Sequence, residues 1–104
     1  PSPDLADFMV ARLVRSFRNE EFLVYRLSHE GGDYQIRKDD MVFTLSVEGG
    51  HVTLTSQARY ESVARLVVLE ELLVLEDLAH ACSKIRDLDH LKTDLLRGVL
   101  EDED

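Results

Sequence analysis

The chain has 104 residues, of which 44% are hydrophobic and 32% are charged, and its formal net charge at pH 7 is −9. This length and composition predict one ordered domain with a small core, and they argue against a wholly disordered chain. The negative charge argues against nucleic acid and anionic membranes as partners, because both select clustered positive charge. No apolar run approaches the roughly 18 residues of a membrane span.

The single cysteine and the first residues bear on location and completeness. Cys82 permits no internal disulfide, which fits a reducing compartment and predicts a cytoplasmic protein. Residues 1–4 contain no initiator methionine, no basic segment and no signal-peptide core. We therefore expect a trimmed chain, with a longer parent protein left open.

The first expected element is a helix over residues 3–17. Ser2 suits the N-cap, and Pro3 suits the first helical position, where a missing backbone N–H does no harm. The apolar residues that follow recur at helical spacing: Leu5, Phe8, Met9, Val10, Leu13, Val14 and Phe17. We expect the helix to end at Arg18-Asn19.

Strands are expected next. Residues 22–28, 34–37 and 41–47 carry alternating, β-favouring side chains, and residues 29–33 between them have turn chemistry with two glycines. This order of short strands and turns predicts an antiparallel meander of three to four strands.

The number of strands depends on a change of parity. The apolar positions Tyr34 and Ile36 are even-numbered, whereas those over 41–47 are odd-numbered. One flat strand cannot keep both sets on one face. Residues 38–40 therefore hold either a turn, which gives four strands and is favoured, or a bulge, which gives three.

The sharpest local pattern is Gly49-Gly50, because two glycines between strands suit a tight hairpin turn. A two-residue loop there pairs apolar with apolar and threonine with threonine across the strands. The predicted pairs are Glu48 with His51, Val47 with Val52, Leu45 with Leu54 and Thr44 with Thr55. We expect one apolar sheet face, one face of Thr, Ser, Gln and Glu, and a solvated tip at Glu48 and His51.

The longest pattern covers residues 60–99 and has no glycine or proline before Gly98. Apolar residues recur every seven positions and at interleaved ones: Val67, Val74, Ala81, Leu88 and Leu95, with Ala64, Leu78, Ile85 and Val99 between. This spacing indicates a helix that packs along its length. Unbroken, it would be about 60 Å long at ~1.5 Å per residue. A break near residues 83–89 is the alternative left open.

The first half of this segment is apolar on nearly all sides, so it needs cover on more than one side. We expect the sheet to cover one side and a second copy of the chain to cover another, which predicts a homodimer. The predicted interface residues are Leu66, Val67, Leu73, Val74, Leu78, Ala81, Ile85 and Leu88. Leu75 is expected to lie off this face.

Together the elements predict one α+β domain over residues 1–100. It has an N-terminal helix, an antiparallel β-meander and a long C-terminal helix packed on the sheet. Residues 101–104 are expected to form an acidic tail.

Motifs that carry chemistry are missing from the sequence. It has no phosphate-binding glycine loop, dinucleotide fingerprint, zinc-protease motif or EF-hand loop. On a helix, His80, Cys82 and His90 are spaced too poorly to share one metal ion. We therefore expect no catalytic residue, no cofactor and no metal. The paired acids at 70–71 and 76–77 are expected to form a solvated acidic edge, or to meet a basic partner.

The sequence predicts a non-enzymatic protein-protein interaction module, such as an adaptor, an assembly factor or a chaperone-like protein, that dimerises through its long helix. One alternative is a small ligand-binding domain or enzyme with a site between sheet and helix. Its polar groups would be Tyr25, Arg26, Tyr34 or Arg37, and an apolar cavity lined by them would favour it. The other alternative is a trimmed subunit domain of a larger heteromeric assembly.

Overall fold

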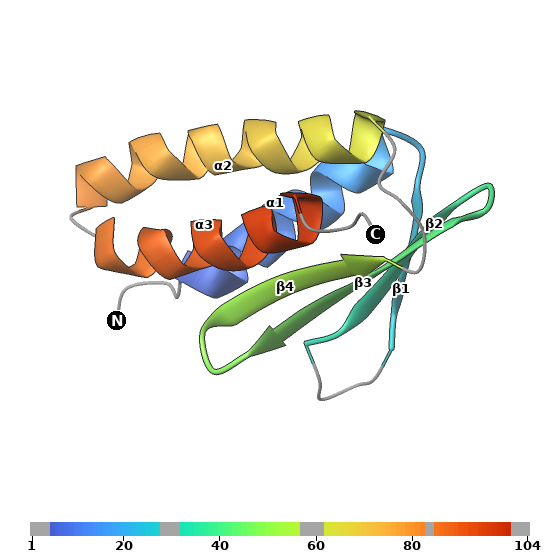
Figure 1. Cartoon of the computed structure of the whole chain (residues 1–104), viewed down its shortest axis with the longest axis horizontal. Helices are drawn as coiled ribbons and strands as arrows, with labels where there is room; N and C mark the ends of the chain where they lie inside the picture. The colour runs from blue at the N-terminus through green and yellow to red at the C-terminus, as the bar shows by residue number, and fades with distance from the viewer. Residues whose placement is uncertain (1–4, 28–31, 57–61, 83–84, 101–104) are drawn as a thin grey trace.

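The computed structural model describes residues 5–27, 32–56, 62–82 and 85–100 (Figure 1), without the side chains of residues 56, 62–64, 78–82, 85–87 and 98–100. In chain order the elements are α1 (Leu5–Asn19), β1 (Leu23–Arg26), β2 (Tyr34–Lys38), β3 (Met41–Glu48), β4 (His51–Ser56), α2 (Ser62–Cys82) and α3 (Ile85–Leu100). The predicted α+β class is confirmed. The predicted cap at Ser2 and the acidic tail at 101–104 lie outside the described residues.

The strands pair in chain order, β1-β2-β3-β4, and every neighbouring pair is antiparallel. Asp39 and Asp40 form the turn between β2 and β3. Asp39 has a positive φ of 55°, a conformation that aspartate tolerates in turns. This turn resolves the parity change, because it sets Ile36 opposite Phe43. The predicted arrangement with four strands is confirmed.

The β3–β4 hairpin has the predicted register. Gly49 and Gly50 have positive φ angles of 60° and 83°, as a two-residue hairpin turn with two left-handed positions requires. All predicted pairs are present: Glu48–His51, Val47–Val52, Leu45–Leu54 and Thr44–Thr55. The inner face of this hairpin is therefore apolar, and its outer face is mostly polar.

The helices form two layers over the inner face of the sheet. α1 and α3 lie on that face, and α2 lies on the side of these helices away from the sheet (Figure 1). α2 ends at Cys82, and α3 begins at Ile85 and returns alongside it, so the alternative of a break near 83–89 is confirmed. α3 packs on the sheet as predicted. α2 packs on α1 and α3 instead, because those two helices already occupy the apolar face.

The end of α1 is held by backbone hydrogen bonds and aromatic packing. The N–H of Phe22 donates to the carbonyl of Phe17 at 2.9 Å, and the N–H of Glu21 donates to that of Arg18 at 2.9 Å. This is the Schellman pattern, and Glu21 has the left-handed φ, 70°, that it requires. The rings of Phe17 and Phe22 pack edge to face with centroids 5.1 Å apart, which ties the helix end into the core.

Glu21→Gly should raise the free energy of unfolding by about 0.5–1 kcal/mol, because glycine adopts a left-handed φ without the steric cost that glutamate bears. Urea unfolding followed by circular dichroism measures the change. Glu21→Ala is the control, since it removes the side chain but keeps the Cβ, and it should change stability by less than about 0.5 kcal/mol. Equal stabilisation by both variants would contradict the explanation by backbone strain.

Candidate functional sites

α2 is apolar on two opposite faces. Toward α1 and α3 it buries Val67, Val68, Leu72 and Leu75. On the other side Leu66, Leu69 and Leu73 are 56%, 41% and 63% exposed. Their spacing of three and four residues aligns them along the helix. We call these three residues the leucine stripe.

The leucine stripe contains two of the predicted interface residues, Leu66 and Leu73. Val74, also predicted there, is half-buried. Leu69 was not among the predicted interface residues, although it is one helical turn from both Leu66 and Leu73. A helical wheel of the segment would have placed it with them.

The remaining predicted interface residues do not face outward wherever the structure describes them. Val67 and Leu88 are buried in the core of the single chain. Leu75, expected to lie off the packed face, is fully buried. The side chains of Leu78, Ala81 and Ile85 lie outside the described residues. The seven-residue pattern at Val67 and Leu88 thus results from packing within one chain and not from an interface between two chains.

A buried ion pair joins α2 to α1. Glu71 is 7% exposed, and its carboxylate accepts hydrogen bonds from Nε of Arg12 at 2.5 Å and from Oγ of Ser16 at 2.6 Å. Arg12 and Ser16 share one edge of α1 because they are four residues apart. The expectation of a solvated acidic edge is wrong at Glu71, whereas Glu70 and Asp77 are exposed as expected.

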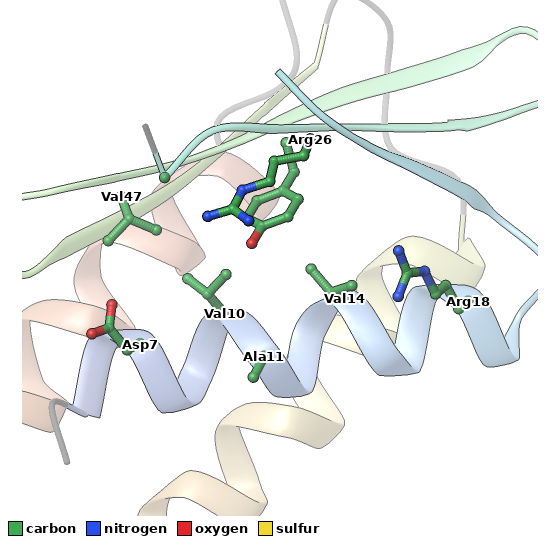
Figure 2. Close-up of a pocket in the computed structure, with 9 residues that line it drawn as sticks. Asp7, Val10, Ala11, Val14, Arg18, Arg26 and Val47 are labelled. Carbon is green, nitrogen blue, oxygen red and sulfur yellow. The ribbon is translucent and has the colours of Figure 1, made fainter. Parts of the chain in front are cut away.

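A groove of about 820 Å³ runs between α1 and the inner face of the sheet (Figure 2). Its apolar lining includes Val10 and Val14 on α1 and Val47 near the end of β3. Gly32 lies against Val47 so closely that an added Cβ would be 3.0 Å from the Cβ of Val47, so a larger residue would push this wall apart. The volume is in the range of small-molecule sites, roughly 300–1,000 Å³.

The polar groups of the groove are separated by sign along α1. Asp7 lies near one end of the helix and Arg18 near the other, and Arg26 reaches from β1 toward α1 between them (Figure 2). Tyr34 of β2 also lines the groove. None of these four side chains forms a hydrogen bond or an ion pair with a residue that the structure describes.

The groove matches part of the site predicted between sheet and helix. Arg26 and Tyr34 line it, as that alternative expected. Tyr25 and Arg37 do not, because they have the opposite parity on β1 and β2 and line a separate hollow of about 410 Å³. Arg18 was not foreseen, since it comes from α1 and meets the strands only in the folded chain.

The tip of the β3–β4 hairpin is held on α3 by a histidine–aspartate pair. Asp94 is 8% exposed, and its Oδ2 lies 2.7 Å from Nδ1 of His51. Nε2 of His90 donates to the carbonyl of Gly50 at 3.0 Å, and the two histidine rings lie with centroids 4.7 Å apart. The side chain of His51 is still 56% exposed, so the tip is solvated as expected, but it also contacts α3. This arrangement fixes the hairpin tip on the helix.

Glu71→Ala should lower the free energy of unfolding by about 1–3 kcal/mol, because Arg12 and Ser16 lose a buried acceptor. Urea unfolding measures the loss, and Glu70→Ala on the exposed face is the matched control, with a change below about 0.5 kcal/mol. A double-mutant cycle with Arg12→Ala should give a coupling of at least about 0.5 kcal/mol. If Glu71→Ala and Glu70→Ala changed the free energy of unfolding equally, the Glu71 carboxylate would be solvated and not paired with Arg12.

Asp94→Ala should destabilise the chain by roughly 1–2 kcal/mol and speed hydrogen exchange at the amides of His51 and Thr53, which bond across the hairpin, because the tip loses its attachment to α3. Asp89→Ala is the control, since Asp89 lies on the same helix but is exposed. Unchanged exchange in Asp94→Ala would mean that the hairpin holds its position without the pair.

Within the described ranges, no three or more His, Cys, Asp and Glu side chains are placed to hold a metal ion. The side chains of His80 and Cys82 lie outside those ranges. No helix in the described part of the chain has both the length and the apolar character needed to cross a membrane. Comparisons of the chain with protein-family models, with curated proteins and with solved structures found no match.

Proposed function

We propose that this chain is a non-enzymatic protein-protein interaction module that forms a homodimer through the leucine stripe of α2. One observation carries the proposal: Leu66, Leu69 and Leu73 stay exposed, aligned, on the helix that lies farthest from the sheet (Figure 1). Apolar surface left in water forgoes about 25 cal/mol per Å². Aligned exposed leucines therefore favour a second surface that covers them.

A second copy of the chain is a partner that supplies a matching stripe. Leucines three and four residues apart interdigitate when two helices pack side by side. A two-fold axis brings the same surface of both chains together, so one stripe suffices for both sides of the interface. Glu70 and Asp77 are exposed beside the stripe and would form a polar rim.

In this proposal the dimer works as an adaptor, an assembly factor or a chaperone-like protein in the cytoplasm. The net charge of −9 supports further partners with basic surfaces, because opposite charge speeds and orients association. The single Cys82 supports a reducing compartment. In the alternative of a trimmed subunit domain of a larger heteromeric assembly, the stripe would meet a different chain instead of a second copy.

Light scattering coupled to size-exclusion chromatography, over a tenfold concentration range, should give the wild type about twice the monomer mass. Leu73→Gln should weaken the dimer at least about tenfold, a loss of roughly 1.4 kcal/mol, while the circular dichroism spectrum stays unchanged. Leu23→Gln is the matched control. Leu23 is 60% exposed, close to the 63% of Leu73, but lies on the outer face of the sheet.

A wild type that is monomeric at every concentration would overturn the proposal, and so would dissociation by Leu23→Gln but not by Leu73→Gln. The salt dependence of association distinguishes a second copy of the chain from a basic partner. Two chains that each carry −9 should associate more tightly at higher salt, because screening reduces their repulsion. A complex with a basic chain would instead weaken.

A further inference from the structure

Two arginines without an acidic partner in the described part of the chain border the groove between α1 and the sheet. Arg18 comes from α1 and Arg26 from β1 (Figure 2). The chain has 21 acidic and 12 basic residues, and elsewhere Arg12 and Lys92 each pair with a glutamate. Unpaired arginines are ordinary on an open surface. These two differ because both line one groove that also has apolar walls.

We propose that this groove binds a small anionic amphiphile: an organic molecule with a carboxylate or phosphate head and a short apolar chain. A guanidinium presents a planar fork of N–H donors that fits either head group. Arg18 and Arg26 supply two such forks, and the hydroxyl of Tyr34 supplies another donor. The site is independent of the proposed dimer interface, because no groove residue belongs to the leucine stripe.

The apolar walls of the groove are the reason to expect an apolar chain in the ligand. Val10, Val14 and Val47 line the groove and offer an alkyl chain a surface to cover. Asp7 lies at the end of α1 opposite Arg18 (Figure 2), so a negative head is repelled from one end and attracted to the other. Arg26 lies between Asp7 and Arg18, with its guanidinium above Val10 (Figure 2). The ligand therefore lies with its head between the two arginines, away from Asp7, and its chain against the valines.

The same features disfavour larger anions. Nucleic acid would meet a chain of net charge −9, and its phosphates need an extended positive surface. The groove volume, about 820 Å³, instead suits a molecule of small-ligand size.

The test is a titration of ¹⁵N-labelled protein with octanoate, octyl phosphate and neutral octan-1-ol, each below its aggregation concentration, followed by amide chemical shifts. Saturable shifts at Val14, Gly32 and Val47 with at least one anion, and none with octan-1-ol, are expected. The tighter of the two anions identifies the preferred head group. Absence of saturable shifts with both anions would overturn the proposal, and so would shifts confined to Leu69 and Leu73, which would mean adhesion to the leucine stripe.

Matched variants test the arginines. Arg26→Gln and Arg18→Gln should each raise the dissociation constant about threefold or more, whereas Arg37→Gln on the outer face of the sheet and Arg15→Gln on α1 should leave it unchanged. Wild-type affinity in both Arg18→Gln and Arg26→Gln would overturn the proposal. Repeating the titration with Leu73→Gln keeps the two proposals apart, because a variant that no longer dimerises should still bind the anion.

Discussion

The single apolar face of the sheet determines where every helix lies. Side chains alternate along each strand, so Ile36, Phe43, Leu45, Val52 and Leu54 are all buried on one side. Four strands about 4.8 Å apart make a face roughly 15–20 Å wide, and packed helices lie about 8–10 Å from one another. That face has room for two helices. α1 and α3 take both places, and α2 is left to form a second layer.

The position of α2 explains why a helix apolar on all sides keeps leucines in water. It can bury only the face turned toward α1 and α3, and that face carries Glu71 beside four buried apolar side chains. A buried carboxylate without partners is costly, so α2 is stable in the rotation that brings Glu71 to Arg12 and Ser16. At about 100° per residue, this rotation turns Leu66 and Leu73 to the opposite side. The leucine stripe thus lies opposite the side of α2 that carries both this polar contact and the buried apolar residues.

Local sequence patterns predicted the strands and turns of the sheet well, because turn type and strand parity depend on residues that are close in the sequence. The Gly49-Gly50 register follows from those patterns alone, and the turn at residues 38–40 was favoured by them over a bulge. The arrangement of the helices in two layers could not be predicted in this way. A seven-residue repeat indicates that one side of a helix is packed, but it does not indicate which element packs against it. Val67 illustrates this: it was expected at an interface between chains and is buried within one.

The candidate sites also have a part that local patterns predict and a part that they do not. Parity places Arg26 and Tyr34 on the inner face of the strands, so part of the groove was predictable. The same parity would have excluded Tyr25 and Arg37. The pairs of Arg12 with Glu71 and of His51 with Asp94 span 59 and 43 positions. Contacts of this range have no local pattern, because they depend on which elements lie side by side after folding.

α1 lies between the two proposed binding surfaces, the groove and the α2 helix that carries the leucine stripe. One edge of it carries Arg12 and Ser16, which hold α2, and the other carries Val14 and Arg18, which line the groove. The leucine stripe faces away from the sheet, whereas the groove lies between α1 and the sheet, so a second copy on the stripe leaves the groove open. Binding at one surface therefore affects the other only if α1 moves against α2. Such a movement would stretch the hydrogen bonds to Glu71, which resist it.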